Sequence, residues 1–143
     1  MGLRRFFKNR YREYVLRHQK TIPFHGLDIP IRRAGMIPPI LTQIWSDAYE
    51  TPEITGLTAV IRPGDRVLEL GTGLGIVTAL ASRATGPTGR VQSYEANPAL
   101  IDATRDFLAA HGCSNTEVIH GVLVPGDTKG TRRFHLAGSF AES

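Results

Sequence analysis

The sequence contains a single cysteine, Cys113, among its 143 residues. One cysteine excludes an internal disulfide and a metal site built from cysteines. No apolar run approaches the roughly 20 residues that a helix needs to cross a bilayer. The basic N-terminus lacks the apolar block and small-residue cleavage site of a secretory signal. We therefore expect a protein of the reducing cytoplasm, without a metal site.

Neither the apolar nor the charged content is extreme. Hydrophobic residues make up 41% of the chain and charged residues 21%, close to the averages of globular proteins. Such a composition can bury a sizeable core, which excludes a disordered chain. The length suits one domain, since domains run to roughly 100–200 residues.

Positive charge is concentrated at one end of the chain. Residues 1–20 hold seven basic side chains and one acidic one, whereas residues 21–143 hold 10 basic and 12 acidic side chains. Apolar residues at spacings of three and four predict an amphipathic helix in this basic arm. One interpretation is a helix docked on the domain; the alternative is weak contact with an anionic membrane surface. No motif here is typical of base reading, so we expect no nucleic-acid partner.

The apolar pattern predicts an α/β fold. Alternation over residues 21–31 predicts a hairpin around His25-Gly26, and residues 35–48 predict a loop that leads into a short helix. Thr51 is expected to cap the next helix, with Pro52 in its first turn. Beyond these come predicted strands at 67–70, 91–95 and 117–120, with helices from Ile76 and Asn97 between them. This order predicts a Rossmann-like parallel sheet with right-handed crossovers.

A glycine turn follows the first of these strands. It reads Glu69-Leu70-Gly71-Thr72-Gly73-Leu74-Gly75, and glycines let a backbone turn sharply and approach a ligand closely. It is not the dinucleotide motif G-x-G-x-x-G, because Ile76 holds the sixth position, and no Gly-Lys-Ser/Thr follows as in a P-loop. The Glu69 carboxylate would repel a pyrophosphate, but it suits the ammonium and sulfonium of S-adenosylmethionine.

Glu95 closes the second strand of the predicted sheet. A carboxylate at this position can accept hydrogen bonds from both hydroxyls of a ribose. Glu69 or Glu95 alone could equally be an ordinary solvated carboxylate. Together with the glycine turn on a strand–turn–helix–strand frame, they favour a site for an adenosine-containing cofactor.

These segments resemble the FkbM-type S-adenosylmethionine-dependent methyltransferases, a family of class I enzymes. The resemblance rests on residues 67–75, 94–98 and 115–122, with a lead-in at 49–53 and 62–65. It implies that Glu69, Gly71 and Gly73 hold the methionine portion and that Glu95 holds the ribose. The remaining residues that we expect around the cofactor are Thr72, Gly75, Ala96 and Asn97.

By the same resemblance, the expected reaction is O-methylation of a hydroxyl on a small molecule or a sugar. Such a transfer needs alignment of donor and acceptor and can use a base for the hydroxyl proton. No residue is assigned as that base, because no spacing ties His25, His111 or His135 to the turn. The alternatives are a non-catalytic nucleoside-binding module or truncated inactive fragment, and a membrane-surface or partner-binding protein that acts through its basic arm.

Three core strands are predicted, where a class I methyltransferase sheet has seven. After Gly121 the pattern offers only an edge strand at about 132–136. We therefore expect a domain that is truncated after its third core strand, with an N-terminal helix and hairpin, and oligomer formation is left open. Apolar surface should then be exposed where a fourth strand would pair with the first.

Overall fold

The computed structural model describes residues 18–126, 130, 131, 133 and 135. Its elements are β1 (Thr21–Phe24), β2 (Leu27–Pro30), α2 (Pro38–Trp45), α3 (Thr51–Val60), β3 (Arg66–Leu70), α4 (Ile76–Thr85), β4 (Arg90–Glu95), α5 (Pro98–Ala110) and β5 (Thr116–His120). The helix expected over residues 1–20 and the edge strand expected at 132–136 fall almost wholly outside the described residues. Within the described ranges, no helix is both long and apolar enough to cross a membrane.

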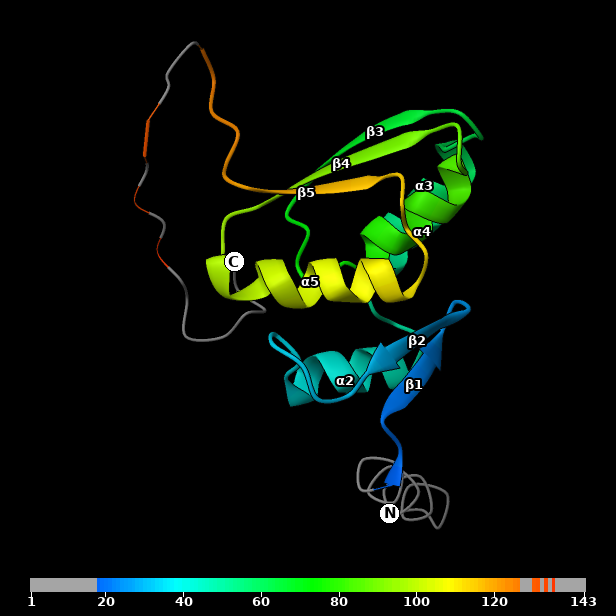
Figure 1. Ribbon diagram of the computed structural model, residues 1–143. Coiled ribbons are helices and arrows are strands. Elements are labelled where there is room, and N and C mark those ends of the chain that lie inside the picture. The colour runs from blue at the N-terminus through cyan, green and yellow to red at the C-terminus, as the bar shows by residue number, and fades with distance from the viewer. Residues whose placement is uncertain (1–17, 127–129, 132, 134, 136–143) are drawn as a thin grey trace.

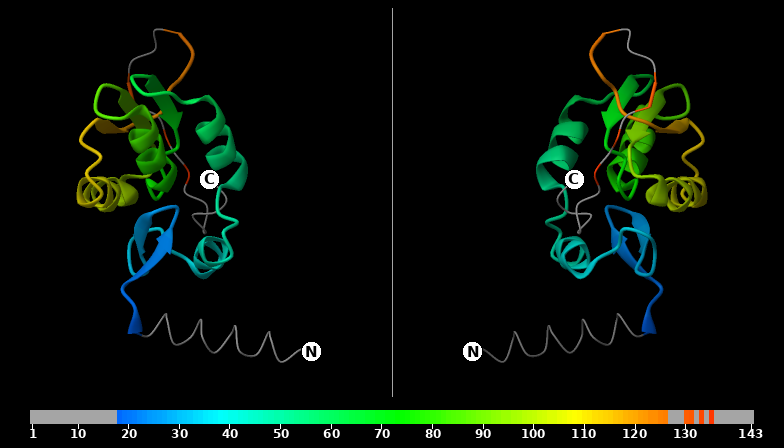
Figure 2. Two further views of the ribbon diagram at one scale, coloured as in Figure 1. Left: turned by 90° about the vertical axis from the view of Figure 1, so that its right-hand side faces the viewer. Right: turned by 90° about the vertical axis from the view of Figure 1, so that its left-hand side faces the viewer.

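β1 and β2 form the predicted hairpin, with Ile22 opposite Ile29 in an antiparallel pair. Its turn residues His25 and Gly26 have positive φ angles of 47° and 76°, as a two-residue turn that matches the twist of the strands requires. Ile22, Ile29 and Phe24 are buried. The hairpin and α2 lie side by side, on the side of α5 away from the sheet (Figures 1 and 2).

Two polar contacts fix the hairpin to the helices. The backbone N–H of Asp28 donates to Nε2 of His111 at 3.1 Å, and Nη1 of Arg83 donates to the carbonyl of Gly26 at 3.0 Å. Nδ1 of His111 lies 2.8 Å from the carbonyl of Phe107. A carbonyl can only accept, so Nδ1 carries the hydrogen and Nε2 is free to accept from Asp28. The contacts of His111 are thus with the fold and not with a reacting group.

α3 begins at Thr51, but Thr51 is not its cap. The first helical hydrogen bond runs from the N–H of Ile54 to the carbonyl of Glu50, which makes Glu50 the capping residue with a left-handed φ of 47°. The prediction that Thr51 caps this helix is therefore wrong by one residue. Pro52 lies in the first turn as predicted, where its missing N–H costs no helical bond.

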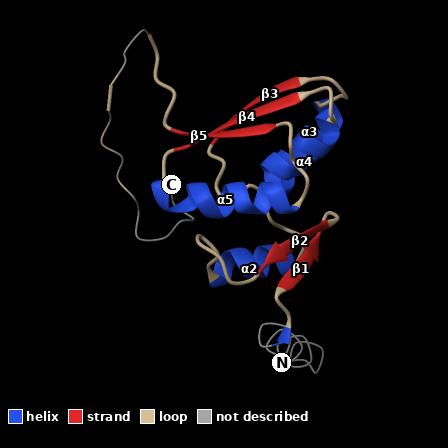
Figure 3. Ribbon diagram, viewed as in Figure 1, coloured by secondary structure: helices blue, strands red, loops and turns tan. Residues whose placement is uncertain are grey.

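β3, β4 and β5 form a parallel sheet in the order β3-β4-β5. Leu70 pairs with Tyr94, and Tyr94 with Ile119. α4 packs against β3 and β4, and α5 packs against β4 and β5, both beneath the sheet in Figures 1 and 3. The predicted Rossmann-like α/β arrangement is confirmed, because β3 and β4 are each followed by a helix, α4 and α5, that leads back to the next parallel strand.

β3 presents two different sides. Val67 and Glu69 are half-buried toward α4, whereas Leu68 and Leu70 keep 58% and 65% of their surface exposed. Within the described part of the chain, β3 pairs with β4 alone. The side of β3 that faces away from α4 therefore exposes apolar surface.

Candidate functional site

The glycine turn joins the carboxyl end of β3 to α4, and its glycines serve two purposes. Gly71, Gly73 and Gly75 all have positive φ, at 88°, 53° and 73°, a conformation that glycine adopts without strain. A Cβ at Gly71 or Gly73 would meet no atom within 4 Å, whereas a Cβ at Gly75 would lie 2.7 Å from Cγ2 of Thr104. The first two glycines thus leave open space beside the turn, and Gly75 lets α4 and α5 pack closely.

Hydrogen bonds hold the turn against β4 and α5. The N–H groups of Gly71 and Thr72 both donate to the carbonyl of Tyr94, at 2.8 and 3.1 Å. The hydroxyl of Thr104 donates to the carbonyl of Gly73 at 2.8 Å. A turn held in this way keeps its shape before any ligand arrives, which lowers the entropic cost of binding.

Glu95 ends β4 beneath this turn and is 93% buried, with 7% of its surface exposed. Its Oε2 accepts from the N–H of Gly73 at 2.8 Å, and its Oε1 accepts from the N–H of Asn97 at 2.7 Å. Asn97 in turn caps α5, as predicted, by accepting from the N–H of Ala99 at 3.0 Å. Each carboxylate oxygen of Glu95 retains acceptor capacity after these bonds.

Glu69 lies at the other side of the turn, half-buried between β4 and α4. Its Oε2 accepts from the hydroxyls of Ser93 and Thr78, both at 2.6 Å. Burial raises the pKa of Glu69 above its usual value, and the two hydroxyl donors act in the opposite direction. The carboxylates of Glu50 and Glu95 raise it further. The site therefore carries concentrated negative charge, which a cationic ligand would relieve.

The other predicted residues lie around the same turn. Thr72 is buried, and its hydroxyl lies 2.5 Å from that of Ser93, so its side chain points into the protein. Ala96 is half-buried, and its carbonyl lies 3.3 Å from Nε2 of His120. The structure thus brings all of the predicted positions from β3, the turn and β4 into one neighbourhood.

Sequence reasoning missed Ser93, Thr78 and Glu50. Ser93 and Thr78 are fully buried, although a buried strand and the inner face of a helix favour apolar residues. A polar residue at a core-facing position of a strand or helix is therefore the sequence signal that could have identified these two residues. Glu50 has a raised pKa, first from burial and then from the neighbouring Glu53.

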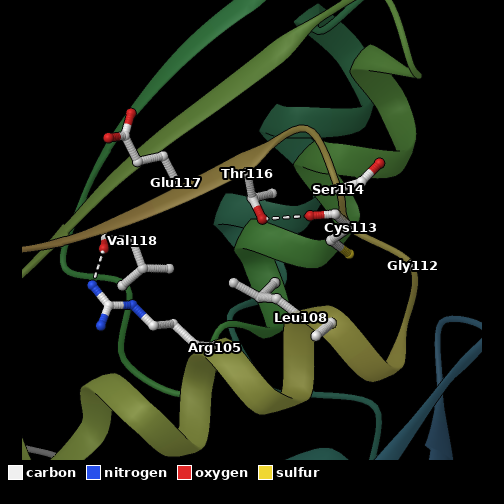
Figure 4. A pocket seen from close by; sticks show the side chains of 9 residues that line it. Arg105, Leu108, Gly112, Cys113, Ser114, Thr116, Glu117 and Val118 are labelled. Carbon is white, nitrogen blue, oxygen red and sulfur yellow. Dashed lines mark hydrogen bonds between the residues drawn. The ribbon is translucent and has the colours of Figure 1, made fainter.

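A separate groove of about 610 Å³ lies between α5 and β5 (Figure 4). Its lining includes Leu108, Cys113 and Val118, and Arg105 closes one side by donating to the carbonyl of Val118 at 2.8 Å. It sits where β5 begins, at the opposite end of the sheet from the glycine turn. Ligands of open parallel sheets bind beyond the carboxyl ends of the strands, so this groove is not the candidate site.

A family model described as "Protein-L-isoaspartate(D-aspartate) O-methyltransferase (PCMT)" matches residues 10–128. This range covers most of the chain and includes the glycine turn, Glu69 and Glu95. The chain belongs to this family. Membership confirms the expected class, an S-adenosylmethionine-dependent methyltransferase of Rossmann-like fold, and its cofactor.

Individual members of this methyltransferase family align with part of the chain. Protein-L-isoaspartate O-methyltransferase 2 of Archaeoglobus fulgidus is 44% identical over 43% of this chain and 28% of its own length. The corresponding enzyme of Ignicoccus hospitalis is 41% identical over 44% of this chain and 30% of its own length. A solved structure of a protein-L-isoaspartate O-methyltransferase covers 52% of this chain and 24% of its own, at 25% identity and a TM-score of 0.48. The chain thus matches less than a third of the length of these relatives.

The more specific family expectation is wrong, since the matching family is the isoaspartate methyltransferases and not the FkbM-type enzymes. The segments that carry the resemblance are centred on the glycine turn and the three strands of the parallel sheet. Such turns serve the cofactor throughout the class, so they carry little information about the acceptor.

The expected partners must also be corrected. The family's name gives a protein residue as acceptor, so the expectation of a small-molecule or sugar acceptor is wrong. The expectation of no nucleic-acid partner fails among the relatives as well. A tRNA (adenine(58)-N(1))-methyltransferase catalytic subunit of Cryptococcus neoformans is 34% identical over 48% of this chain and 16% of its own length.

Proposed function

We propose that this chain supplies the S-adenosylmethionine site of an enzyme that methylates the carboxylate of L-isoaspartate or D-aspartate residues in proteins. The observation that carries the proposal is the family match over residues 10–128. The glycine turn supports the cofactor half of the proposal independently, by its geometry and charge. The acceptor half rests on the family alone.

The residues around the turn fit a ligand that joins an adenosine to an amino-acid tail. Open space beside Gly71 and Gly73 allows the ligand to approach the backbone. A carboxylate can accept about four hydrogen bonds, and Glu95 uses one on each oxygen. Two acceptor positions therefore remain for the two hydroxyls of a ribose. The negative charge of Glu69 suits the ammonium and sulfonium of the other half.

In this proposal, Glu69, Gly71 and Gly73 hold the methionine portion and Glu95 holds the ribose. The residues that shape the turn or flank the adenosine are Thr72, Gly75, Ala96 and Asn97. When bound, the cofactor supplies an electrophilic methyl group on its sulfonium. A carboxylate acceptor is already ionised at neutral pH, so an acceptor of this class needs no general base.

Calorimetric titration of the purified chain with S-adenosylhomocysteine, beside NAD, tests the cofactor half. Saturable binding of S-adenosylhomocysteine alone is the expected result. Binding of neither ligand, or of NAD in preference, by a chain shown to be folded would overturn it.

Transfer of labelled methyl groups to a pair of peptides tests the acceptor half. The peptides differ only in carrying isoaspartate or aspartate at one position, so that the charge and the sequence are the same. Label in the isoaspartyl peptide alone is expected. Equal labelling of both peptides, or labelling of the aspartyl peptide in preference, would count against the proposed acceptor. The division into a basic arm (1–20) and a cofactor-binding unit (21–143), and a cytoplasmic location, stay predictions.

A further inference from the structure

Three buried hydroxyl groups form a directed chain of hydrogen bonds that ends on Glu69. The hydroxyls of Ser93 and Thr78 both donate to Oε2 of Glu69 at 2.6 Å. A serine hydroxyl has only one hydrogen, and that of Ser93 is used on Glu69. In the 2.5 Å contact between Thr72 and Ser93, Thr72 must therefore be the donor. Donation thus runs from Thr72 to Ser93 to Glu69, and Thr78 donates to the same oxygen from α4.

The two carboxylate oxygens of Glu69 differ in their hydrogen-bond partners. Oε2 takes both hydroxyl donors, and among the described residues no side chain donates to Oε1. Ser93 and Thr78 show no exposed surface, so water does not compete for their hydroxyls. The carboxylate is held by one oxygen near the carboxyl end of β3, two residues before Gly71, and its other oxygen retains its acceptor capacity.

We propose that Ser93 and Thr78 are positioning residues that hold the Glu69 carboxylate for the ammonium group of the cofactor's amino-acid tail. The inference rests on the proposed S-adenosylmethionine site and deepens it. It assigns the two hydroxyls to one half of the ligand, because Glu95, and not Glu69, lies at the end of β4 where the ribose is expected. Ser93 and Thr78 therefore contribute to recognition of the tail and not of the adenosine.

The same contacts set the protonation of Glu69. Burial and the carboxylates of Glu50 and Glu95 raise the pKa of Glu69, while the hydroxyls of Ser93 and Thr78 lower it. The neighbouring Tyr49 is buried, and its own raised pKa keeps it neutral. Loss of either hydroxyl removes one of the two hydrogen bonds that lower the pKa of Glu69, so this pKa rises further. Glu69 is then protonated at higher pH, and a neutral carboxyl attracts an ammonium weakly.

Two isosteric substitutions on α4 provide a matched test. Thr78 and Thr85 are both fully buried, and Thr85 donates to the carbonyl of Ser82 at the far end of the helix from the glycine turn. Thr78→Val and Thr85→Val therefore each remove one buried hydroxyl, but only the first removes a donor to Glu69. Calorimetry with two ligands, S-adenosylhomocysteine and adenosine, separates the tail from the nucleoside.

Thr78→Val is expected to weaken S-adenosylhomocysteine binding about tenfold, as for the loss of one hydrogen bond to a charged group, and to leave adenosine binding unchanged. Ser93→Ala should do the same, and Thr78→Ser should restore binding. The pH below which S-adenosylhomocysteine affinity falls should move upward in Thr78→Val. Thr85→Val should leave both affinities and this pH unchanged.

Equal losses for both ligands, or equal effects of Thr78→Val and Thr85→Val, would overturn the inference and assign the hydroxyls a structural role only. An unchanged pH profile in Thr78→Val would also overturn it. Failure of the proposed function gives a different result, because the unsubstituted chain would then not bind S-adenosylhomocysteine at all.

Discussion

The backbone N–H of Gly73 donates to Oε2 of Glu95 at 2.8 Å, so one carboxylate joins the glycine turn to the end of the neighbouring strand. The other oxygen of Glu95 accepts from the N–H of Asn97, at the start of α5. One side chain thus supports three parts of the candidate site at once: the turn, the strand end and the helix cap.

Glu95→Ala should weaken both stability and binding. Two backbone N–H groups lose their acceptor, and an unsatisfied buried group costs about 1–3 kcal/mol. S-adenosylhomocysteine and adenosine should both bind at least about tenfold more weakly, since the ribose belongs to both. Urea denaturation and calorimetry measure the two effects. Glu117→Ala is the control, because Glu117 is an exposed partner of Arg90. Unchanged affinity for adenosine in Glu95→Ala would contradict the assignment.

Alanine at two glycines of the turn should separate packing from binding. Gly75→Ala places a Cβ 2.7 Å from Thr104 in a left-handed conformation, so we expect a loss of more than about 2 kcal/mol of unfolding free energy. Gly71→Ala meets no atom within 4 Å and should cost only the backbone strain of about 1–2 kcal/mol. The space that it fills is the proposed ligand space, so S-adenosylhomocysteine affinity should fall. Retained affinity in a folded Gly71→Ala chain would show that the ligand does not bind beside the turn.

Stability should decrease as the pH rises above the usual carboxyl pKa of 4.5. Burial raises the folded-state pKa of Glu69 and of Glu50 above that value. In the window between the unfolded and the raised folded pKa, the folded chain keeps a proton that the unfolded chain has lost. The unfolding free energy is therefore highest below the window and falls as the pH rises through it.

Glu69→Gln tests this pH dependence, because the amide does not titrate. Urea denaturation at successive pH values should show a smaller fall in stability for Glu69→Gln than for the unsubstituted chain. Glu50→Gln should remove a separate part of the same fall. Identical pH profiles for all three proteins would rule out both groups as the origin.

The exposed side of β3 should promote self-association. Leu68 and Leu70 lie on the face of β3 that is turned away from α4 and are 58% and 65% exposed, and an exposed apolar patch is a site for association. Sedimentation velocity should show concentration-dependent association that Leu68→Thr with Leu70→Thr reduces, with little change in stability. Leu57→Thr is the contrast, since Leu57 is 9% exposed and its truncation should cost about 2–4 kcal/mol. Association that survives the double substitution would assign the contact to another surface.

Much of the fold was accessible from local pattern. The turn His25-Gly26, the capping residue Asn97 and the order of strands and helices after Arg66 were all predicted and are confirmed. Each depends on backbone geometry or hydrogen bonds within a few residues. The start of α3 at Thr51 agrees with the structure, but its capping residue is Glu50 and not Thr51, because the left-handed conformation of Glu50 is not encoded by its residue type.

The sequence by itself determined the class of the protein. Glycines at fixed spacing after a buried strand, with acidic residues at two strand ends, are a local pattern, and this pattern is sufficient for a Rossmann-like methyltransferase. It did not determine the family, because the turn belongs to the cofactor half of the whole class. Only the tertiary structure showed that Ser93 and Thr78, from different elements, converge on one oxygen of Glu69. Contacts of that kind arise when a helix packs on a sheet, and no spacing along the chain specifies them.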